Sequence, residues 1–362
     1  MSRIRPPASA AGGNGIERDQ LRAGGQAPAA ELLPPPLEEP RPGRVLIAWR
    51  RAPFPVDWAL AFGRLAPLHL EVGFGDGRFT VRRALERPDE DHVGVEVSNV
   101  SVQRALARVR REGVDNVRVA KVGAAFALRQ LFGPHSVRSI TVNFPDPWPK
   151  ERHERHRLLR RAFFELAASR LSPGGEIRLT TDHLDYLAFA RSEARASGRY
   201  TLPAVAPPPA VLETKYALKW REQGKPLHYQ VFRLERPSDS HPPHLERPPV
   251  PHAFMTGPAV DPSRLPSDAK RVIAYADAHV IVHEGWRAFG SGERLLFRVT
   301  VDELELTQQL LVVALRREGG ELIVRLERFG DPLITPAVRG AVHAVVEWLL
   351  EHTELRVRER NY

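Results

Sequence analysis

The sequence predicts an α/β protein with a doubly wound, mostly parallel sheet, followed by a smaller α+β domain. Short apolar runs alternate with amphipathic stretches from about residue 68 to residue 197, a pattern typical of parallel strands connected by helices. Proline-rich stretches lie near residues 34–42 and 237–266. After the second stretch the pattern changes to successive strands and one helix, which indicates a separate domain.

The strands of the α/β part are predicted at residues 68–72, 92–97, 116–122, 137–143 and 176–181. Helices are predicted at residues 79–85, 100–111, 124–132, about 158–171 and 183–197. The helix at 100–111 rests on Val102, Leu106 and Val109, which recur at helical spacing. Because ligands of such sheets bind at the carboxyl ends of the strands, the functional residues are expected there.

The composition divides the chain into four parts. Residues 1–43 are rich in alanine, glycine and proline without a period, and we expect them to be disordered. Residues 44–236 form the α/β domain. Residues 237–266 are predicted to be a linker, because dense proline is incompatible with a helix or a central strand. Residues 267–362 form an accessory α+β domain.

The accessory domain is predicted from a run of strand-like segments. They lie at residues 272–276, 280–283, 294–301, 304–316 and 322–328, and a helix follows at residues 337–351. Consecutive strands favour antiparallel pairing, which gives the α+β class. The last residues include Arg356, Arg358 and Arg360.

Charge and composition limit the possible functions. The net charge is +9 with a sequence pI of about 10.2, which makes a polyanionic partner plausible, although arginine-rich usage alone can produce it. The absence of cysteine excludes disulfides, thiolate metal sites and cysteine nucleophiles. No apolar run approaches the roughly 20 residues that span a bilayer, and the N-terminus lacks a signal-peptide core. We therefore expect a cytoplasmic protein without a membrane partner.

The first strand runs into a glycine-rich turn with Gly73, Gly75 and Gly77, preceded by Glu71. Glycines at alternate positions let the backbone pass close to a ligand at the start of the next helix. A nicotinamide fingerprint would need glycine where Arg78 stands. The spacing is instead the form used for S-adenosylmethionine, although a glycine turn of this kind can also be purely structural.

The second strand ends at Glu96. A carboxylate at this position can accept hydrogen bonds from both ribose hydroxyls of an adenosine. The alternative is a solvated acid at a strand end. The glycine turn beside it favours the first interpretation.

The most informative segment is N-F-P-D-P-W-P-K at residues 143–150, directly after the fourth strand. Its prolines stiffen a loop that carries Asp146, Trp148 and Lys150. A basic run follows, and it either holds phosphates or is a solvated helix start. Its phosphate-binding candidates are Arg152, Arg155 and Arg157. His153 and His156 lack a third ligand, so no metal site is predicted.

The octet, with x-R-H-x-x-x-R after it, resembles the signature of bacterial tRNA (guanine-N7-)-methyltransferases, a family of class I, Rossmann-like enzymes dependent on S-adenosyl-L-methionine. Four further segments resemble the family in the same order. They are the cofactor turn at 70–75, the ribose-binding strand at 94–97, the fifth strand end at 179–182 and the late motif at 214–216. The resemblance covers roughly residues 45–236.

The resemblance implies methyl transfer from S-adenosyl-L-methionine to N7 of the variable-loop guanine, position 46, of tRNA. Glu71, Glu96 and the turn glycines would contact the cofactor, and Asp146 would lie at the reacting centre, in reach of both cofactor and base. The RNA substrate would be contacted by Lys150, Asp182 and the stretch Thr214, Lys215, Tyr216 and Ala217.

Two residues depart from the family pattern. Gly123 stands where an acid usually lies near the adenine, so adenine contacts would come from backbone or from elsewhere. Ala217 stands where the family has glutamate. Glu213 or Glu222 could replace that carboxylate in the guanine pocket.

Two other functions stay open from sequence. One is a methyltransferase with another acceptor, such as adenine N6 or a protein side chain, although adenine N6 enzymes carry N-P-P-[FY] after the fourth strand. The other is a non-catalytic RNA-binding protein on a degenerate methyltransferase fold. The accessory domain could bind tRNA, or it could support dimerisation or stability. Sequence leaves the oligomeric state open.

Overall fold

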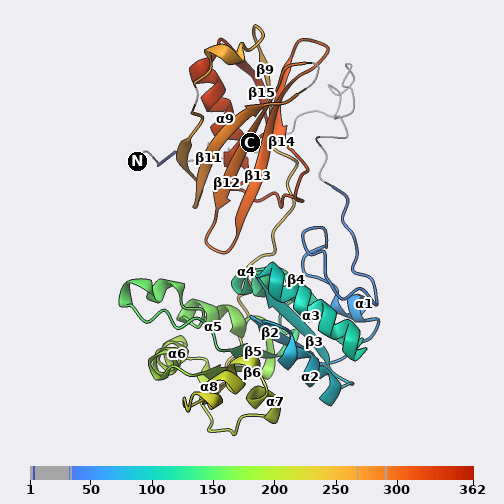
Figure 1. The fold of residues 1–362 in the computed structure, drawn as a ribbon, viewed down its shortest axis with the longest axis vertical. Coiled ribbons are helices and arrows are strands. Elements are labelled where there is room, and N and C mark those ends of the chain that lie inside the picture. The colour runs from blue at the N-terminus through green and yellow to red at the C-terminus, as the bar shows by residue number, and fades with distance from the viewer. Residues whose placement is uncertain (1–2, 5–31, 33–34, 267, 290–291) are drawn as a thin grey trace. The chain divides into compact units, whose positions relative to one another are not determined.

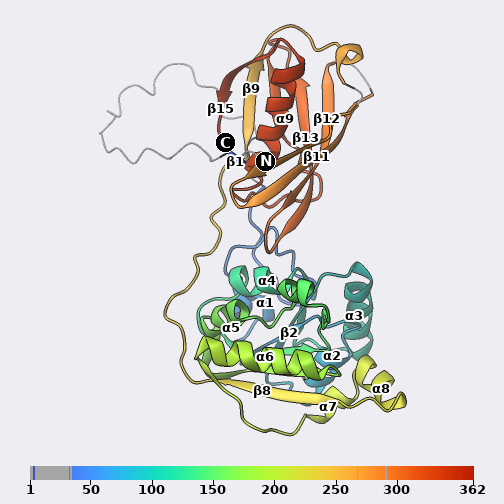
Figure 2. The same cartoon turned by 90° about the vertical axis from the view of Figure 1, so that its left-hand side faces the viewer.

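The computed structural model describes residues 3–4, 32, 35–266, 268–289 and 292–362. The chain forms two compact units, which we describe separately (Figures 1 and 2). The larger unit comprises residues 37–245, and the smaller unit comprises the other described residues, chiefly 246–362. Among the described residues, no helix combines the length and the apolar character that a bilayer span requires.

A seven-stranded sheet with the order β4-β3-β2-β5-β6-β8-β7 lies at the centre of the larger unit. Strands β2 to β6 pair in parallel with one another, whereas β8 pairs antiparallel with both β6 and β7. The predicted mostly parallel sheet is thus confirmed. The chain order reverses between β2 and β5, which marks the switch point where ligands bind in open α/β sheets. The bounds are β2 Leu68–Val72, β3 Asp91–Glu96, β4 Val117–Lys121, β5 Val137–Asn143, β6 Leu171–Thr181, β7 Tyr200–Thr201 and β8 His228–Leu234.

The helices of this unit form two contacting sets. One contains α2 and α3, and the other contains α4, α5 and α6. Right-handed crossovers place such sets on opposite faces of the sheet. Helix ends follow local signals, because Asp57, Ser98 and Thr214 cap α1, α3 and α8 through their side chains. The bounds are α1 Trp58–Phe62, α2 Arg78–Glu86, α3 Asn99–Glu112, α4 Ala124–Gln130, α5 Arg161–Ala168, α6 Leu184–Ser197, α7 Pro209–Leu212 and α8 Lys215–Glu222.

The long helix expected at residues 158–171 is wrong in its extent. A 3-10 helix, Glu151–His156, comes first, α5 starts only at Arg161, and β6 already begins at Leu171. The reason is the preceding residue, since the Arg157 guanidinium donates to the carbonyls of Pro147 and Trp148. These hydrogen bonds hold residue 157 against the proline loop, so the helix begins only after it, at Arg161. The sequence also gave no prediction of α1, α7, α8, β7 or β8.

The smaller unit contains an eight-stranded sheet with the order β1-β10-β11-β12-β13-β14-β9-β15. All neighbours are antiparallel except β1 and β10. One helix, α9 Arg339–His352, lies along the sheet (Figure 2). This confirms the predicted α+β class. The bounds are β1 Arg3–Ile4, β9 His252–Thr256, β10 Arg271–Tyr275, β11 Ala278–Arg287, β12 Arg294–Asp302, β13 Thr307–Arg316, β14 Leu322–Leu326 and β15 Arg356–Arg360; a 3-10 helix spans Pro262–Arg264.

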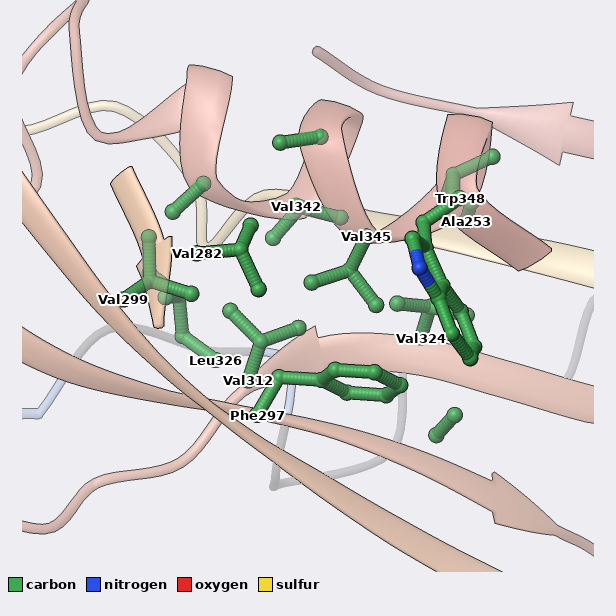
Figure 3. Close-up of a cluster of buried hydrophobic side chains, with 14 of the residues drawn as sticks. Ala253, Val282, Phe297, Val299, Val312, Val324, Leu326, Val342, Val345 and Trp348 are labelled. Carbon is green, nitrogen blue, oxygen red and sulfur yellow. The ribbon is translucent and has the colours of Figure 1, made fainter. Parts of the chain in front are cut away.

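The core of the smaller unit lies between α9 and one face of its sheet. Figure 3 shows Val342 and Val345 of α9 pointing toward valines of the strands. The rings of Phe297 and Trp348 meet edge to face, with centroids 5.4 Å apart. Removing these apolar side chains from water is the main stabilising contribution of this unit.

The structure corrects the predicted linker at residues 237–266. Strand β9 lies inside that range and pairs with β14 and β15, with Ala253 and Met255 fully buried. The strand itself contains no proline; Pro251 precedes it and Pro258 follows it. Residues before it pack on the larger unit, where the backbone N–H of Ser238 donates to the carbonyl of Ala168.

The predicted disorder of residues 1–43 falls mostly on residues outside the described ones. Within this range, Arg3–Ile4 pairs with β10. The backbone N–H of Glu38 donates to the carbonyl of Arg51. These described pieces have defined structure, in contrast to the expectation.

Candidate active site

A cavity of about 560 Å³ lies at the carboxyl edge of the parallel strands in the larger unit. Its wall includes residues that follow β2, end β3, follow β4 and end β5, namely Gly73, Gly75, Glu96, Val122 and Asn143. Four segments distant in sequence therefore meet around one space. The volume falls within the range of small-molecule sites.

Gly73 and Gly75 form the floor of the turn after β2. Their φ values are 69° and 56°, in the left-handed region that glycine adopts without a steric penalty. A Cβ built on either glycine would meet no atom within 4 Å. The space above them is therefore open for a ligand that approaches the backbone.

Gly77 has a different role from the predicted cofactor contact, because it lies outside the cavity wall. It is the N-cap of α2 with a φ of 74°. A Cβ at this position would lie 2.8 Å from the Cβ of Ala105 on α3. Gly77 therefore allows α2 and α3 to pack closely.

Glu71 is buried near the end of β2 and lines the cavity. Its carboxyl accepts hydrogen bonds from the Thr80 hydroxyl and from Asn143 Nδ2. Burial raises the pKa of Glu71 to about 7, while the hydrogen bonds from Thr80 and Asn143 act in the opposite direction. The group can thus change its protonation state near neutral pH.

Glu96 is half-buried at the end of β3. Its Oε1 accepts from the backbone N–H groups of Val97 and Ser98, at 2.8 and 3.0 Å. Its Oε2 accepts from Gly75 N at 3.2 Å, across the glycine turn. These bonds fix the carboxylate beside the turn, where further lone pairs remain for ribose hydroxyls.

The cavity continues between α3 and α4, where Val97, Val122 and Ala124 provide apolar surface. Gly123 is the N-cap of α4 and lies between two lining residues without lining the cavity itself. An apolar slot of this kind suits the flat face of an adenine. The sequence did not indicate Arg104 of α3, which also lines this end, because its position within a helix carries no motif.

The proline loop between β5 and the 3-10 helix has two non-glycine residues in the left-handed region. They are Phe144, with a φ of 52°, and Trp148, with a φ of 42°. Such conformations cost about 1–3 kcal/mol and are retained where the surrounding structure enforces them. Here the Arg157 guanidinium holds the carbonyls of Pro147 and Trp148.

Asp146 is exposed at the tip of this loop and lines the cavity. Glu71, Asp76 and Glu96, the other carboxylates of the described wall, all have hydrogen-bond or ion-pair partners. Asp146 has none among the described residues. Its oxygens are therefore available to a ligand.

Arg157 corrects one prediction, because it is buried and cannot serve as a free phosphate contact. Besides the two loop carbonyls, it pairs with Glu154 at 2.8 Å and lies over the Phe189 ring. Arg152 and Arg155 are exposed, as expected of phosphate-binding candidates. Lys150 is also exposed, outside the cavity wall. His156, which the sequence analysis considered only as a possible metal ligand, lines the cavity with its ring 5.1 Å from that of Trp148.

The late motif reaches the cavity through Thr214, Lys215 and Tyr216. The Thr214 hydroxyl caps α8 by accepting from Ala217 N at 3.2 Å. Ala217 is buried, so the carboxylate that the family has at this position would need a different local packing. The Tyr216 ring lies 5.9 Å from that of Phe144.

Three predicted acids lie outside the cavity wall. Asp182 faces the Lys225 ammonium at 4.0 Å. Glu213 forms an ion pair with Arg82 at 3.7 Å. Glu222 is exposed and does not line the cavity. Neither Glu213 nor Glu222 therefore lines the cavity in place of the carboxylate that Ala217 lacks.

Comparisons with known proteins identify the family. Residues 65–230 match the family model described as putative methyltransferase. A tRNA (guanine-N(7)-)-methyltransferase of Thermus thermophilus is 45% identical over 295 residues, which cover 80% of this chain and 91% of the relative. The Deinococcus radiodurans enzyme of the same name is 42% identical, over 82% of this chain and 92% of the relative.

The chain belongs to the tRNA (guanine-N(7)-)-methyltransferase family. The alignment of 295 residues is longer than the larger unit, so the similarity extends into the smaller unit. This corrects the sequence interpretation, which limited the resemblance to residues 45–236.

The cofactor of this methyltransferase family is S-adenosylmethionine, and the cavity fits it. The open space over Gly73 and Gly75 accommodates a ligand against the backbone. Asn143 Oδ1 is buried at the same wall with no hydrogen-bond partner among the described residues, as an acceptor for a ligand amino group would be. Glu96 is placed to accept from the ribose hydroxyls, and the apolar surface of Val97, Val122 and Ala124 suits the adenine. The described residues contain no group of three His, Asp or Glu side chains that could hold a metal ion.

Proposed function

We propose that this chain transfers the methyl group of S-adenosylmethionine to N7 of the variable-loop guanine of tRNA, and that residues 37–245 carry this activity. The observation that supports this most is the position of Asp146, an unpaired carboxylate in the same cavity as Gly73 and Glu96. The relatives from Thermus and Deinococcus carry the name of this reaction. A tRNA substrate would also place the reaction in the cytoplasm, where the sequence analysis expects the protein.

The chemistry requires alignment more than proton transfer. The bound cofactor supplies an electrophilic methyl group, and guanine N7 has an exposed lone pair, so no base has to remove a proton first. Holding N7 in line with the methyl carbon can contribute roughly 7–11 kcal/mol. Glu96 and the glycine turn would orient the cofactor, while the proline loop would orient the base.

Asp146 would act on the guanine. A carboxylate accepts from N1–H and N2–H₂, an edge that only guanine offers, and it also stabilises the cationic 7-methylguanine as charge develops. With Ala217 buried and Glu213 paired to Arg82, Asp146 is the carboxylate left for either task. The adjacent rings of Phe144 and Tyr216 would stack on an extruded base.

The experiment compares the wild-type protein with Asp146→Ala, using labelled cofactor, bulk tRNA and digestion to nucleosides. We expect labelled 7-methylguanosine from the wild type and a loss of at least 100-fold in the variant. Cofactor affinity by calorimetry and circular dichroism should be unchanged in the variant. Asp185→Ala, an exposed carboxylate on α6, is the matched control and should keep full activity.

Other outcomes would overturn the proposal. A different labelled nucleoside from the wild type would indicate another acceptor. No label from wild-type protein that binds both cofactor and tRNA would indicate a binding protein. Full activity of the Asp146→Ala variant would remove Asp146 from the reacting centre.

A further inference from the structure

Helix α8 and the turn after it carry aromatic and lysine side chains that lead away from the cavity. We call the set Tyr216, Lys219, Trp220 and Lys225 the α8 strip. Tyr216 lines the cavity and is 45% exposed. Trp220 lies one helical turn further on, outside the cavity wall, and its ring is nearly parallel to that of Tyr216, with centroids 6.4 Å apart at 27°. The strip thus continues the surface on which a base in the cavity would lie.

Two ammonium groups stand beside Trp220. The Nζ atoms of Lys225 and Lys219 lie 3.6 and 4.7 Å from its ring centroid. The chain has only six lysines among 53 basic residues, yet three of them fall within residues 215–225. Background arginine usage therefore does not explain the charge here. Lysine is a compact, mobile point charge, and as a point charge it binds phosphates.

The ring of Trp220 is half-buried, and its Nε1 is buried without a hydrogen-bond partner among the described residues. Buried N–H donors are normally paired. Besides the ring, the Lys225 ammonium has, among the residues that the structure describes, only the distant contact to Asp182, at 4.0 Å. The Lys225 side chain can therefore move off the Trp220 ring at little cost when a phosphate binds it more closely than Asp182 does. This movement would uncover the face of the Trp220 ring.

We propose that the α8 strip binds the nucleotide next to the methylated guanosine in the same RNA strand. Its base stacks on Trp220, and Lys219 and Lys225 contact its phosphates. A target base that leaves its stack also frees the neighbouring base, and single-stranded bases are held by aromatic stacking together with positive charge. The combination of the exposed Tyr216 ring, the half-buried Trp220 ring and the ammonium groups favours RNA over an apolar protein partner. This inference rests on the proposed function.

The first experiment tests the stacking. Trp220→Leu in the full-length protein should lower tRNA affinity about tenfold, and Trp220→Phe should restore most of it, because phenylalanine keeps an aromatic face. Cofactor affinity should not change, since Trp220 is outside the cavity wall. Trp286→Leu, at a half-exposed tryptophan of the smaller unit, is the matched control.

An abasic tRNA assigns the contact to one nucleotide. Removing the base on the 5′ or the 3′ side of the target guanosine should weaken binding to the wild type about tenfold at one of the two sites. The same removal should have no further effect on Trp220→Leu. Independent, additive losses at both sites would overturn the proposal, as would unchanged affinity of Trp220→Leu.

The lysines are tested by the salt dependence of binding. Lys219→Gln and Lys225→Gln should each reduce the slope of log affinity against log salt by about 0.7–1. Lys121→Gln, at an exposed lysine that ends β4 outside the cavity wall, controls for net charge. An unchanged slope in both variants would refute the phosphate contacts. Affinity is measured without methyl transfer, so a wild type that binds tRNA through the strip but forms no 7-methylguanosine would refute only the proposed function.

Discussion

At the scale of single residues, two carboxylates of the same cavity have opposite surroundings. Glu96 accepts three backbone N–H bonds at a strand end. Glu71, one strand away, is buried and bonds to neutral side chains, and burial raises its pKa to about 7. The sequence places both acids at strand ends but cannot show this difference, because it depends on Thr80 and Asn143, which come from other elements.

The raised pKa of Glu71 leads to a pH-dependent stability. Between pH 4.5 and 7 the folded protein keeps a proton on Glu71 that the unfolded chain has released. The stabilising contribution of the neutral carboxyl is complete below about pH 4.5. It is lost as the pH rises through 7, by about 3 kcal/mol in total. We expect Glu71→Gln, which stays neutral, to gain free energy of unfolding relative to the wild type as the pH rises from 5 to 8.

Urea unfolding of both proteins at several pH values measures this difference. Burial also lowers the pKa of His69 to about 4 and that of His92 to about 3, so their contribution to stability is lost as the pH falls from 6.5. Both histidines are present in both proteins and cancel in the comparison. A difference that stays constant with pH would show that Glu71 does not titrate in this range.

At the scale of elements, the glycines of the turn between β2 and α2 have two different functions, ligand access and helix packing, which the sequence motif does not distinguish. Gly73 borders open space, whereas Gly77 packs against Ala105. Both have a positive φ, so alanine costs about 1–2 kcal/mol at either position. At Gly77 a steric overlap adds about 1–3 kcal/mol. We expect Gly77→Ala to lower the free energy of unfolding more than Gly73→Ala, and Gly73→Ala to weaken cofactor binding at least tenfold.

Denaturant unfolding and calorimetry with S-adenosylmethionine separate the two effects. Combining Gly77→Ala with Ala105→Gly removes the overlap. The free energy of unfolding that the double mutant loses should therefore be smaller than the sum of the two single losses, by about 1 kcal/mol or more. Additive effects would contradict the packing role of Gly77. Cofactor binding by Gly77→Ala below its unfolding transition should stay close to that of the wild type.

Much of the fold and the site could be predicted because the signals are local. Periodicity indicates the parallel strands, and the residues of the glycine turn, Glu96 and the proline loop follow from strand ends. The role of Arg157 could not be predicted, because it depends on two carbonyls about ten residues away. Strand β9 was missed because proline density masked a short strand without proline. Its pairing with β14 and β15 is a long-range contact that the segment's own residues do not reveal.

At the scale of the whole molecule, the structure moves the end of the larger unit from residue 236 to residue 245. The added residues form hydrogen bonds with polar side chains of that unit. The carbonyl of Pro242 accepts from the buried Arg170 at 3.2 Å, and Leu245 N donates to Gln130 Oε1 at 2.7 Å. A buried guanidinium that loses a partner keeps its desolvation cost without compensation.

Two truncated proteins test this boundary. We expect residues 37–245 to fold and to bind S-adenosylmethionine like the full chain, because every residue of the cavity wall lies between Glu71 and Tyr216. Residues 37–240 should bind the cofactor as well, but with a free energy of unfolding lower by about 2 kcal/mol, because Arg170 and Gln130 lose their partners. Equal stability would mean that residues 241–245 only connect the units. The salt dependence of tRNA affinity is then compared for residues 37–245 and the full chain. A smaller slope for residues 37–245 than for the full chain assigns phosphate contacts to the smaller unit, and equal slopes exclude them.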